Sequence, residues 1–306
     1  MLNFDTKAKV FKELYLQQQL NDEGFVIVDF LNAKEVLNLL NLHNNKHSED
    51  IKGFYTSTFS KDVDYRKEVD SEIQLTMQRG LEYYFENYRV HCGSFIIKAP
   101  DEKSELKLHQ DMTLVDESKY TGINIWIPLI DLNTENGAIE ILPKSHRIFK
   151  TYRGASLPDI YDGVENLVHQ LLQPCYLKAG QAIIFDQSII HFSPANTSKA
   201  ARPVINTFIT HKDAGIRICY WDKLKQNEIE IFEQASDFMV NFQNFGHDIF
   251  SRPSIGTSIG YVPFDFPKLT RQTLEQEYGL AKKQAKVISK NKFSFKELFK
   301  KVFAGS

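Results

Sequence analysis

Cysteine is scarce in this chain of 306 residues, which contains only Cys92, Cys175 and Cys219. No two of them lie close together in sequence, so a CxxC metal knuckle and a disulfide framework are excluded. Few cysteines and no close pair are typical of a reducing compartment. Long apolar runs are also absent: no stretch reaches the roughly 18 residues of a membrane span, and the first residues contain no apolar segment of a secretory signal. We therefore expect a cytoplasmic protein without a membrane span.

Neither sign of charge is in excess. Lys and Arg number 37 and Asp and Glu number 39, giving a net charge of −2 with His neutral. Dedicated nucleic-acid binders usually carry a strong basic excess, so we expect no nucleic-acid partner. Hydrophobic residues make up 42% of the chain, an ordinary globular value. A chain of this length and composition buries a sizeable core, which excludes disorder as its main feature.

The first part of the chain, residues 1–90, is predicted to be a helical support around one strand. Apolar residues recur at helical spacing over 6–20, 33–43 and 71–88. Asn32 is a good N-cap for the second of these helices. The β-branched run at 25–28 predicts a strand.

The second part, residues 91–212, is rich in short strand-like segments separated by turn formers such as Asn136-Gly137. There are eight of these segments: 93–99, 106–115, 122–130, 138–142, 175–178, 182–186, 189–193 and 203–210. This pattern favours an all-β barrel or a double-sheet sandwich. The longest interruption, 144–173, is interpreted as a lid-like insertion over one end of the barrel. The fold class is therefore mostly β with flanking helices.

The third part, residues 213–306, is predicted to be a helical extension. Helices are expected at 229–244, 269–285 and 293–303, with a loop at 251–266. Eight lysines and one acidic residue lie in 281–301, beside an apolar stripe at helical spacing. We interpret this stripe as a helix face packed on the barrel; the alternative is peripheral docking on an anionic membrane or an acidic partner. We expect the three parts to form one domain over residues 1–306.

One strand-like segment carries two good metal ligands. Alternation along a strand places His109 and Asp111 on one face. His191, on another short strand 80 residues after Asp111, is the candidate third ligand. Two imidazoles and one carboxylate form the facial triad that suits non-haem Fe(II). An HxD pair alone is a weak signal, but Arg202 stands just before a further strand, where its side chain can offer a bidentate fork to a carboxylate.

These residues and several longer stretches resemble the iron(II)/2-oxoglutarate dioxygenases of the phytanoyl-CoA dioxygenase family. The similar stretches are LNDEGFVIV at 20–28, WIPL at 126–129, NGAIEILPKSHR at 136–147 and AGQAIIFD at 179–186. The resemblance covers residues 20–212 and implies a double-stranded β-helix, the jelly-roll or cupin-like core. Lys144 departs from the glycine that the hairpin motif usually has, at a position we interpret as structural.

The resemblance also implies roles for individual residues. His109, Asp111 and His191 would bind Fe(II), while Arg202 and Ser193 would hold the far carboxylate of 2-oxoglutarate, the cosubstrate consumed with O₂. The implied reaction hydroxylates an unactivated C–H bond of a small-molecule substrate and releases succinate and CO₂. Because Asp111 is present, hydroxylation is favoured over halogenation.

Two further residues, Asn124 and Trp126, share a strand face and are expected to line the cosubstrate pocket. A buried Trp is more often core, whereas a buried Asn needs hydrogen-bond partners. Two alternatives to the small-molecule enzyme stay open: a non-catalytic metal-binding jelly-roll module or sensor, and a protein side-chain hydroxylase. The substrate, the oxidation outcome and the oligomeric state are not determined by the sequence.

Overall fold

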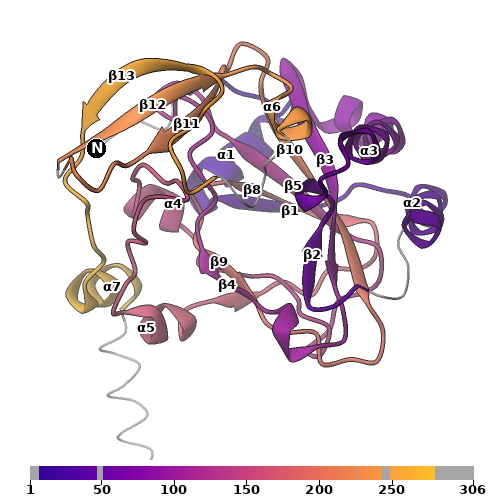
Figure 1. Ribbon diagram of the computed structural model, residues 1–306. Coiled ribbons are helices and arrows are strands. Elements are labelled where there is room, and N and C mark those ends of the chain that lie inside the picture. Colours follow the sequence, from indigo (N-terminus) through magenta and orange to yellow (C-terminus); the bar gives the residue numbers. More distant parts are fainter. Residues whose placement is uncertain (1–6, 47–50, 226, 243–248, 280–306) are drawn as a thin grey trace, which may run out of the picture. The chain divides into compact units, whose positions relative to one another are not determined.

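The computed structural model describes residues 7–46, 51–225, 227–242 and 249–279. The helix expected at 293–303 and the basic stretch 281–301 lie outside these residues. The described helices are α1 (Leu14–Glu23), α2 (Ala33–Lys46), η2 (Ser57–Phe59), α3 (Val63–Tyr84), η3 (Glu102–Ser104), α4 (Ser145–Ile148), α5 (Glu165–His169), α6 (Phe238–Asn241) and α7 (Arg271–Tyr278). The α-helices are labelled in Figure 1.

Six strands form the larger sheet, in the order β1-β8-β5-β10-β3-β2, and every neighbouring pair is antiparallel. Their bounds are β1 (Phe25–Asp29), β2 (Phe54–Thr56), β3 (Tyr88–Lys98), β5 (Ile123–Pro128), β8 (Gln181–Asp186) and β10 (Arg202–His211). β10 lies between β5 and β3, with Arg202 directly opposite Lys98 and Asn206 directly opposite Trp126. Residues directly opposite share a face, so these four side chains belong to the same side of the sheet.

The smaller sheet has four strands in the order β4-β9-β6-β7. Its strands are β4 (Leu106–His109), β6 (Glu140–Ile141), β7 (Gln173–Pro174) and β9 (His191–Ser193). Apolar side chains of the two sheets meet in one buried cluster, in which Ile183 and Phe185 of β8 join Ile141 of β6. The two packed antiparallel sheets form the double-stranded β-helix, or jelly-roll, core that the sequence led us to expect.

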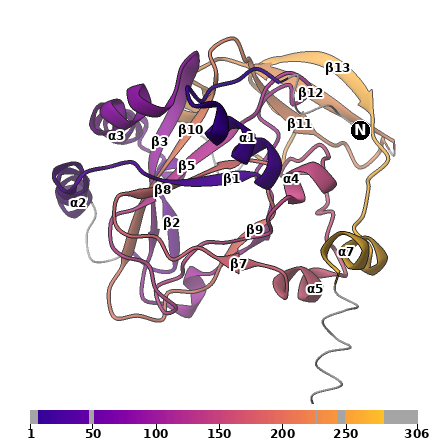
Figure 2. The same cartoon turned by 180° about the vertical axis from the view of Figure 1, so that it is seen from behind.

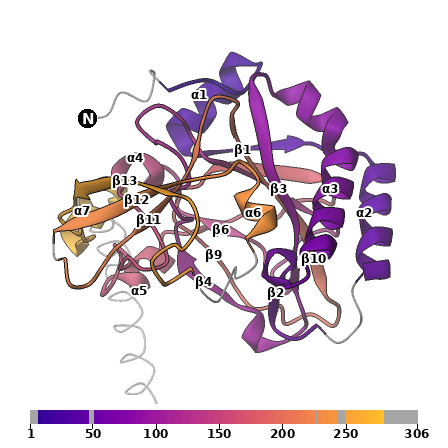
Figure 3. The same ribbon diagram turned by 45° about the horizontal axis from the view of Figure 1, so that its top comes forward.

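Helices α2 and α3 cover the face of the larger sheet that points away from the smaller one (Figures 1 and 3). A capping box starts α2: the Asn32 side chain accepts from the Glu35 amide at 3.0 Å, and the Glu35 carboxylate accepts from the Asn32 amide at 2.8 Å. This is the N-cap predicted for Asn32. Val69, Ile73 and Met77 of α3 are fully buried in the same cluster as the outward-facing residues of β10. The other face of the larger sheet, which includes Arg202, Lys98 and Trp126, points toward the smaller sheet.

The prediction of a helical extension is wrong for residues 213–263. The chain there forms a third antiparallel sheet, β11 (Ile216–Tyr220), β12 (Glu228–Gln234) and β13 (Thr257–Pro263), shown apart from α2 and α3 in Figure 3. The predicted helix 229–244 is strand β12 followed by the single turn α6, and the predicted loop 251–266 contains β13. Ile229 and Ile231 alternate with glutamates, and both isoleucines are buried. That period of two is the strand signal, which a helical interpretation overlooked.

Smaller differences concern element ends. The first helix begins at Leu14 rather than near residue 6, because residues 8–12 are extended and bond to other segments, with Ala8 N donating to Lys119 O at 2.9 Å. The third helix is α3, which begins at Val63 behind the cap Asp62 and ends at Tyr84. The predicted strand 175–178 is not a strand; the ladder there is the preceding pair, β7. Figure 2 shows β1 and α1 from behind.

Residues 160–171 belong to a second compact unit together with the chain from residue 267, of which 267–279 are described. Within this unit Leu269 N donates to Ile160 O at 2.6 Å. The single-domain organisation and the lid role of 144–173 stay predictions. No helix among the described residues is both long and apolar enough to cross a membrane.

The buried His91 of β3 leads to a prediction about acid stability. It is 3% exposed, with Nε2 2.8 Å from Thr210 Oγ1, and burial lowers its pKa from 6.5 to about 4. Between pH 6.5 and pH 4, His91 therefore binds a proton in the unfolded chain but not in the folded chain. The stability contributed by neutral His91 is full above pH 6.5 and is lost as the pH falls toward 4; its size is about 3 kcal/mol.

We expect the free energy of unfolding in urea to fall less between pH 7 and pH 4.5 in His91→Gln than in the unchanged protein. Glutamine has no proton to gain in this range. An equal fall in both proteins would show that His91 does not carry the effect.

Candidate metal and carboxylate site

The three predicted metal ligands meet at the smaller sheet. His109 ends β4, His191 begins β9, and the two residues stand directly opposite each other in the ladder. One ligand atom from each of His109, Asp111 and His191 can be chosen so that all three lie within 4.8 Å of one another. The rings of the two histidines are 4.0 Å apart between centroids. His109 and Asp111 are partly exposed and His191 is buried, so the group has one open side.

Both imidazoles are oriented by the backbone two residues earlier. His109 Nδ1 is 2.7 Å from Lys107 O, and His191 Nδ1 is 3.0 Å from Ile189 O. Since a carbonyl oxygen only accepts, each Nδ1 carries the proton and each Nε2 keeps a lone pair. Burial first, and the nearby His109 second, lower the pKa of His191 to about 4. Neutral imidazoles with a fixed tautomer are the form that binds a metal ion.

The Asp111 carboxylate is held by Asn124. Asn124 Nδ2 donates to Asp111 Oδ2 at 2.5 Å, and Gln187 Nε2 donates to Asn124 Oδ1 at 3.4 Å. The Asp111 amide donates to Gln187 O at 3.0 Å, although β4 has ended two residues earlier. Asn124 was expected to contact cosubstrate or substrate; the structure instead places it behind the ligand carboxylate. Its hydrogen bond leaves Oδ1 of Asp111 to face His109, whose Nε2 is 3.7 Å away.

Arg202 is a buried cation whose fork lacks a partner. It is 1% exposed, and its Nε and Nη1 atoms have no hydrogen-bond acceptor among the described residues. Its guanidinium carbon lies 5.2 Å from the ring centroid of Trp126, which is 5% exposed. Burial lowers the pKa of Arg202 to about 9. A buried guanidinium with two unpaired nitrogens is costly, and a carboxylate is an anion that can accept from such donors.

Lys98 stands beside this fork. It is fully buried, because β3 is covered on both sides by β2 and β10. Lys98 Nζ donates to the carbonyls of Ser193 at 2.6 Å and Pro194 at 2.5 Å. Burial first, and Arg202 second, lower its pKa to about 6. Two basic side chains thus stand opposite each other on β3 and β10, and the sequence pattern contains no signal for the burial of Lys98.

Ser193 lies at the end of β9, and its backbone carbonyl accepts the hydrogen bond from Lys98 Nζ. It is buried, and its hydroxyl donates to Gly137 O at 2.9 Å. A hydroxyl oxygen can still accept while its proton is engaged. The predicted donation from Ser193 to a carboxylate requires this hydroxyl to turn, and it stays a prediction.

The donor set fits both implied groups. Two neutral Nε2 atoms and a carboxylate oxygen suit Fe(II), and the orphaned Arg202 fork suits the far carboxylate of 2-oxoglutarate. A continuous row of side chains joins the two places. Asn124 bonds Asp111, Trp126 lies two residues further along β5, and Arg202 lies over the Trp126 ring. The residues present can therefore hold a metal ion at one end and an anion at the other.

Asn206 is a further polar residue on this face. It stands between Ser94 of β3 and Trp126 of β5, and its Oδ1 is buried without a hydrogen-bond partner in the described part of the chain. Its even spacing from Arg202 along β10 is the signal that places it inside the barrel.

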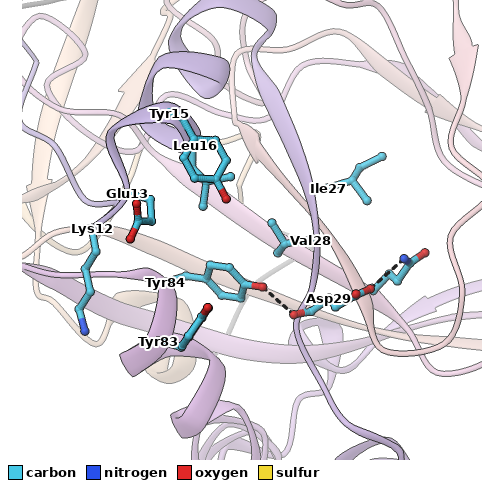
Figure 4. Close-up of a pocket in the computed structure, with 10 residues that line it drawn as sticks. Lys12, Glu13, Tyr15, Leu16, Ile27, Val28, Asp29, Tyr83 and Tyr84 are labelled. Carbon is cyan, nitrogen blue, oxygen red and sulfur yellow. Dashed lines mark hydrogen bonds between the residues drawn. The ribbon is translucent and has the colours of Figure 1, made fainter.

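A pocket of about 480 Å³ lies elsewhere, between α1, the edge strand β1 and the end of α3 (Figure 4). Tyr84 donates its hydroxyl proton to Asp29 O at 2.7 Å across it, and Tyr15 lines the opposite wall. It contains none of the three metal ligands and no catalytic grouping of side chains. The predicted metal ligands lie in the barrel, outside this pocket.

Comparison with known proteins gives two curated relatives. The chain is 30% identical over 127 residues to phytanoyl-CoA dioxygenase domain-containing protein 1 of Danio rerio, over 39% of this chain and 44% of that protein. It is 26% identical over 147 residues to the homolog from Dictyostelium discoideum, over 45% of this chain and 47% of that protein. The match thus spans less than half the length of either relative.

A solved structure supports the fold. The epimerase SnoN, in complex with Fe³⁺, alpha ketoglutarate and nogalamycin RO, superposes with a TM-score of 0.51 at 16% identity, over 81% of this chain and 95% of that one. At this identity the similarity establishes the jelly-roll architecture. The family model for phytanoyl-CoA dioxygenase (PhyH) matches residues 24–204, a stretch that contains every metal and carboxylate residue described above. Since that match covers more than half of the chain, the protein belongs to the phytanoyl-CoA dioxygenase family of iron(II)/2-oxoglutarate-dependent enzymes.

Proposed function

We propose that the protein is an Fe(II)- and 2-oxoglutarate-dependent oxygenase that hydroxylates an unactivated C–H bond of a small molecule. The observation that carries the proposal is the unpaired, 1% exposed Arg202 on the same barrel face as Asn124, which holds the metal-ligand carboxylate of Asp111. A metal-binding module or sensor needs no buried carboxylate clamp. Family membership and the three converging ligands support the same conclusion.

Each residue has a defined task in this proposal. His109, Asp111 and His191 hold the iron, and their fixed orientation leaves the remaining coordination positions on one side. Arg202 binds the far carboxylate of 2-oxoglutarate, with Lys98 as the neighbouring basic side chain and Trp126 forming a wall. When bound, the iron, 2-oxoglutarate and O₂ supply the oxidising chemistry, which releases succinate and CO₂; the chain supplies binding and orientation.

The substrate is proposed to enter the barrel beside the metal. The unpaired Oδ1 of Asn206 is an acceptor inside the barrel that a substrate hydroxyl or N–H can use. A side chain of a protein substrate would need an open cleft lined by strand edges, whereas the barrel interior around Trp126 and Phe185 is closed by buried side chains. This favours the small-molecule class over the protein hydroxylase.

The test is an anaerobic titration with Fe(II) followed by 2-oxoglutarate. We expect Fe(II) to bind and 2-oxoglutarate to produce a weak visible charge-transfer band, because an α-keto acid chelates the metal through its keto and carboxylate oxygens. Succinate release in air then serves as the readout for a substrate screen. If Fe(II) binds but 2-oxoglutarate produces no charge-transfer band, the protein is a metal-binding module instead.

A further inference from the structure

A buried arginine from outside the metal-binding strands contacts the backbone of a metal ligand. Arg153 Nε donates to Asp111 O at 2.6 Å, across 42 residues of sequence. The Arg153 side chain is 6% exposed. Its segment also runs alongside the ligand segment: Thr113 N donates to Arg153 O, and Arg153 N donates to Thr113 Oγ1, both at 3.0 Å.

The rest of the guanidinium is committed to other groups. Nη1 and Nη2 form a fork on the carboxylate of Glu117, at 3.1 and 2.5 Å, and Nη1 also donates to Thr151 O at 2.6 Å. Glu117 is only 10% exposed, so the ion pair is largely desolvated. With the fork anchored, Nε can point only where the planar guanidinium directs it, which is at Asp111 O.

Asp111 needs such external support because it lies beyond the end of β4. Its amide and its Oδ2 are held by Gln187 O and Asn124, and Arg153 holds the third side through the carbonyl. A buried ion pair contributes little net stability, since desolvation offsets most of its Coulomb attraction. Its retention next to a ligand is better explained by orientation than by stability. Groups that orient a metal ligand typically change metal affinity by about 10- to 100-fold.

We propose that Arg153, anchored by Glu117, is a positioning residue for the metal carboxylate of Asp111, and that it makes metal affinity depend on docking of the 149–153 segment against 110–113. The inference rests on the proposed function for the presence of a metal ion. Gln110 supports the same docking, because its Nε2 lies 3.4 Å from Phe149 O and 2.5 Å from Ser188 O. The segment that precedes the second compact unit is thereby tied to the metal site.

The variant Arg153→Lys tests the role of the fork. Lysine keeps the positive charge beside Glu117 but cannot hold the carboxylate in a fork and reach Asp111 O with a fixed Nε–H. The matched control is Arg252→Lys, which removes a similar fork on the buried Glu230, with bonds of 2.8 and 2.7 Å, in the β11–β13 sheet. Anaerobic binding of Mn(II) followed by its paramagnetic resonance signal measures affinity, and the visible spectrum of bound Co(II) reports ligand geometry.

We expect Arg153→Lys to weaken Mn(II) binding by about tenfold or more and to change the Co(II) spectrum, while Arg252→Lys leaves both unchanged. If Arg153→Lys lowers only the melting temperature and leaves both metal readouts unchanged, the positioning role is refuted. The double variant Arg153→Met/Glu117→Met keeps the volume without a buried charge and so remains foldable. It is expected to lose metal affinity as well; unchanged affinity in it would also refute the role. Failure of the unchanged protein to bind metal at all would refute the proposed function instead.

Discussion

Replacing Arg202 by methionine is expected to abolish tight 2-oxoglutarate binding and to make the ligand-free protein more stable. The guanidinium is 1% exposed, with two nitrogens unpaired, so the folded protein without ligand bears an uncompensated desolvation cost. Methionine fills the space without a charge. Exchanging buried charges for apolar groups often stabilises by about 1–4 kcal/mol, whereas loss of a buried partner for a charged ligand costs about 2–5 kcal/mol of binding, or roughly 30-fold to several thousandfold in affinity.

The measurement combines calorimetric melting of the metal-free protein with titration of 2-oxoglutarate into the Fe(II) form. Fe(II) binding without 2-oxoglutarate is expected to be unchanged, because Arg202 is not a ligand. Arg66→Met is a matched control. Arg66 is also buried, at 4% exposed, but it donates to Val240 O and Ser60 O, so its loss is expected to destabilise without affecting 2-oxoglutarate. If Arg202→Met binds 2-oxoglutarate with unchanged affinity, Arg202 does not bind the far carboxylate of this cosubstrate.

Replacing His109 by alanine is expected to abolish metal binding while leaving the fold intact. His109 supplies one of only three protein ligands, and the two that remain, Asp111 and His191, cannot hold a divalent ion tightly against water. We expect the metal dissociation constant to rise by about a hundredfold or more. The side chain is 27% exposed and makes one hydrogen bond, to Lys107 O, so its removal costs little packing. Turnover in the presence of 2-oxoglutarate is expected to be lost with the metal.

His211→Ala is the control for this experiment. His211 also faces a carboxylate, with Nδ1 3.6 Å from Asp213, and lies at the end of β10 with no link to His191. Mn(II) titration measures the metal affinity of both variants, and thermal melting measures their stability. Together they distinguish a metal-binding histidine from one that only stabilises the fold. Retained metal affinity in His109→Ala together with a lowered melting temperature would show that the histidine is structural.

The barrel and the ligand set were accessible from sequence because their signals are local. The alternation around His109 and Asp111 predicted a strand over 106–115 with both residues on one face; β4 ends at His109, so Asp111 lies just beyond the strand. The motif around 179–186 locates the strand before His191. The Asn32 cap marks the start of α2 to the residue. The β11–β13 sheet was missed although Ile229 and Ile231 alternate with glutamates, because charged strand residues were read as a helix surface. In this segment the apolar residues fit both a helical period and the period of two of a strand. Local propensity alone does not decide between a helix and a strand there.

By itself, the sequence determined the class of chemistry: ligands of the right type, in order and at a spacing that two neighbouring strands can bring together. Only the tertiary structure decided which polar groups are buried without hydrogen-bond partners and which form hydrogen bonds with one another. It showed that Lys98 is enclosed beside Arg202, that Asn124 donates to the Asp111 carboxylate, and that Arg153 reaches Asp111 O from 42 residues away. These properties depend on contacts between distant segments, and a local pattern of residue types contains no information about such contacts.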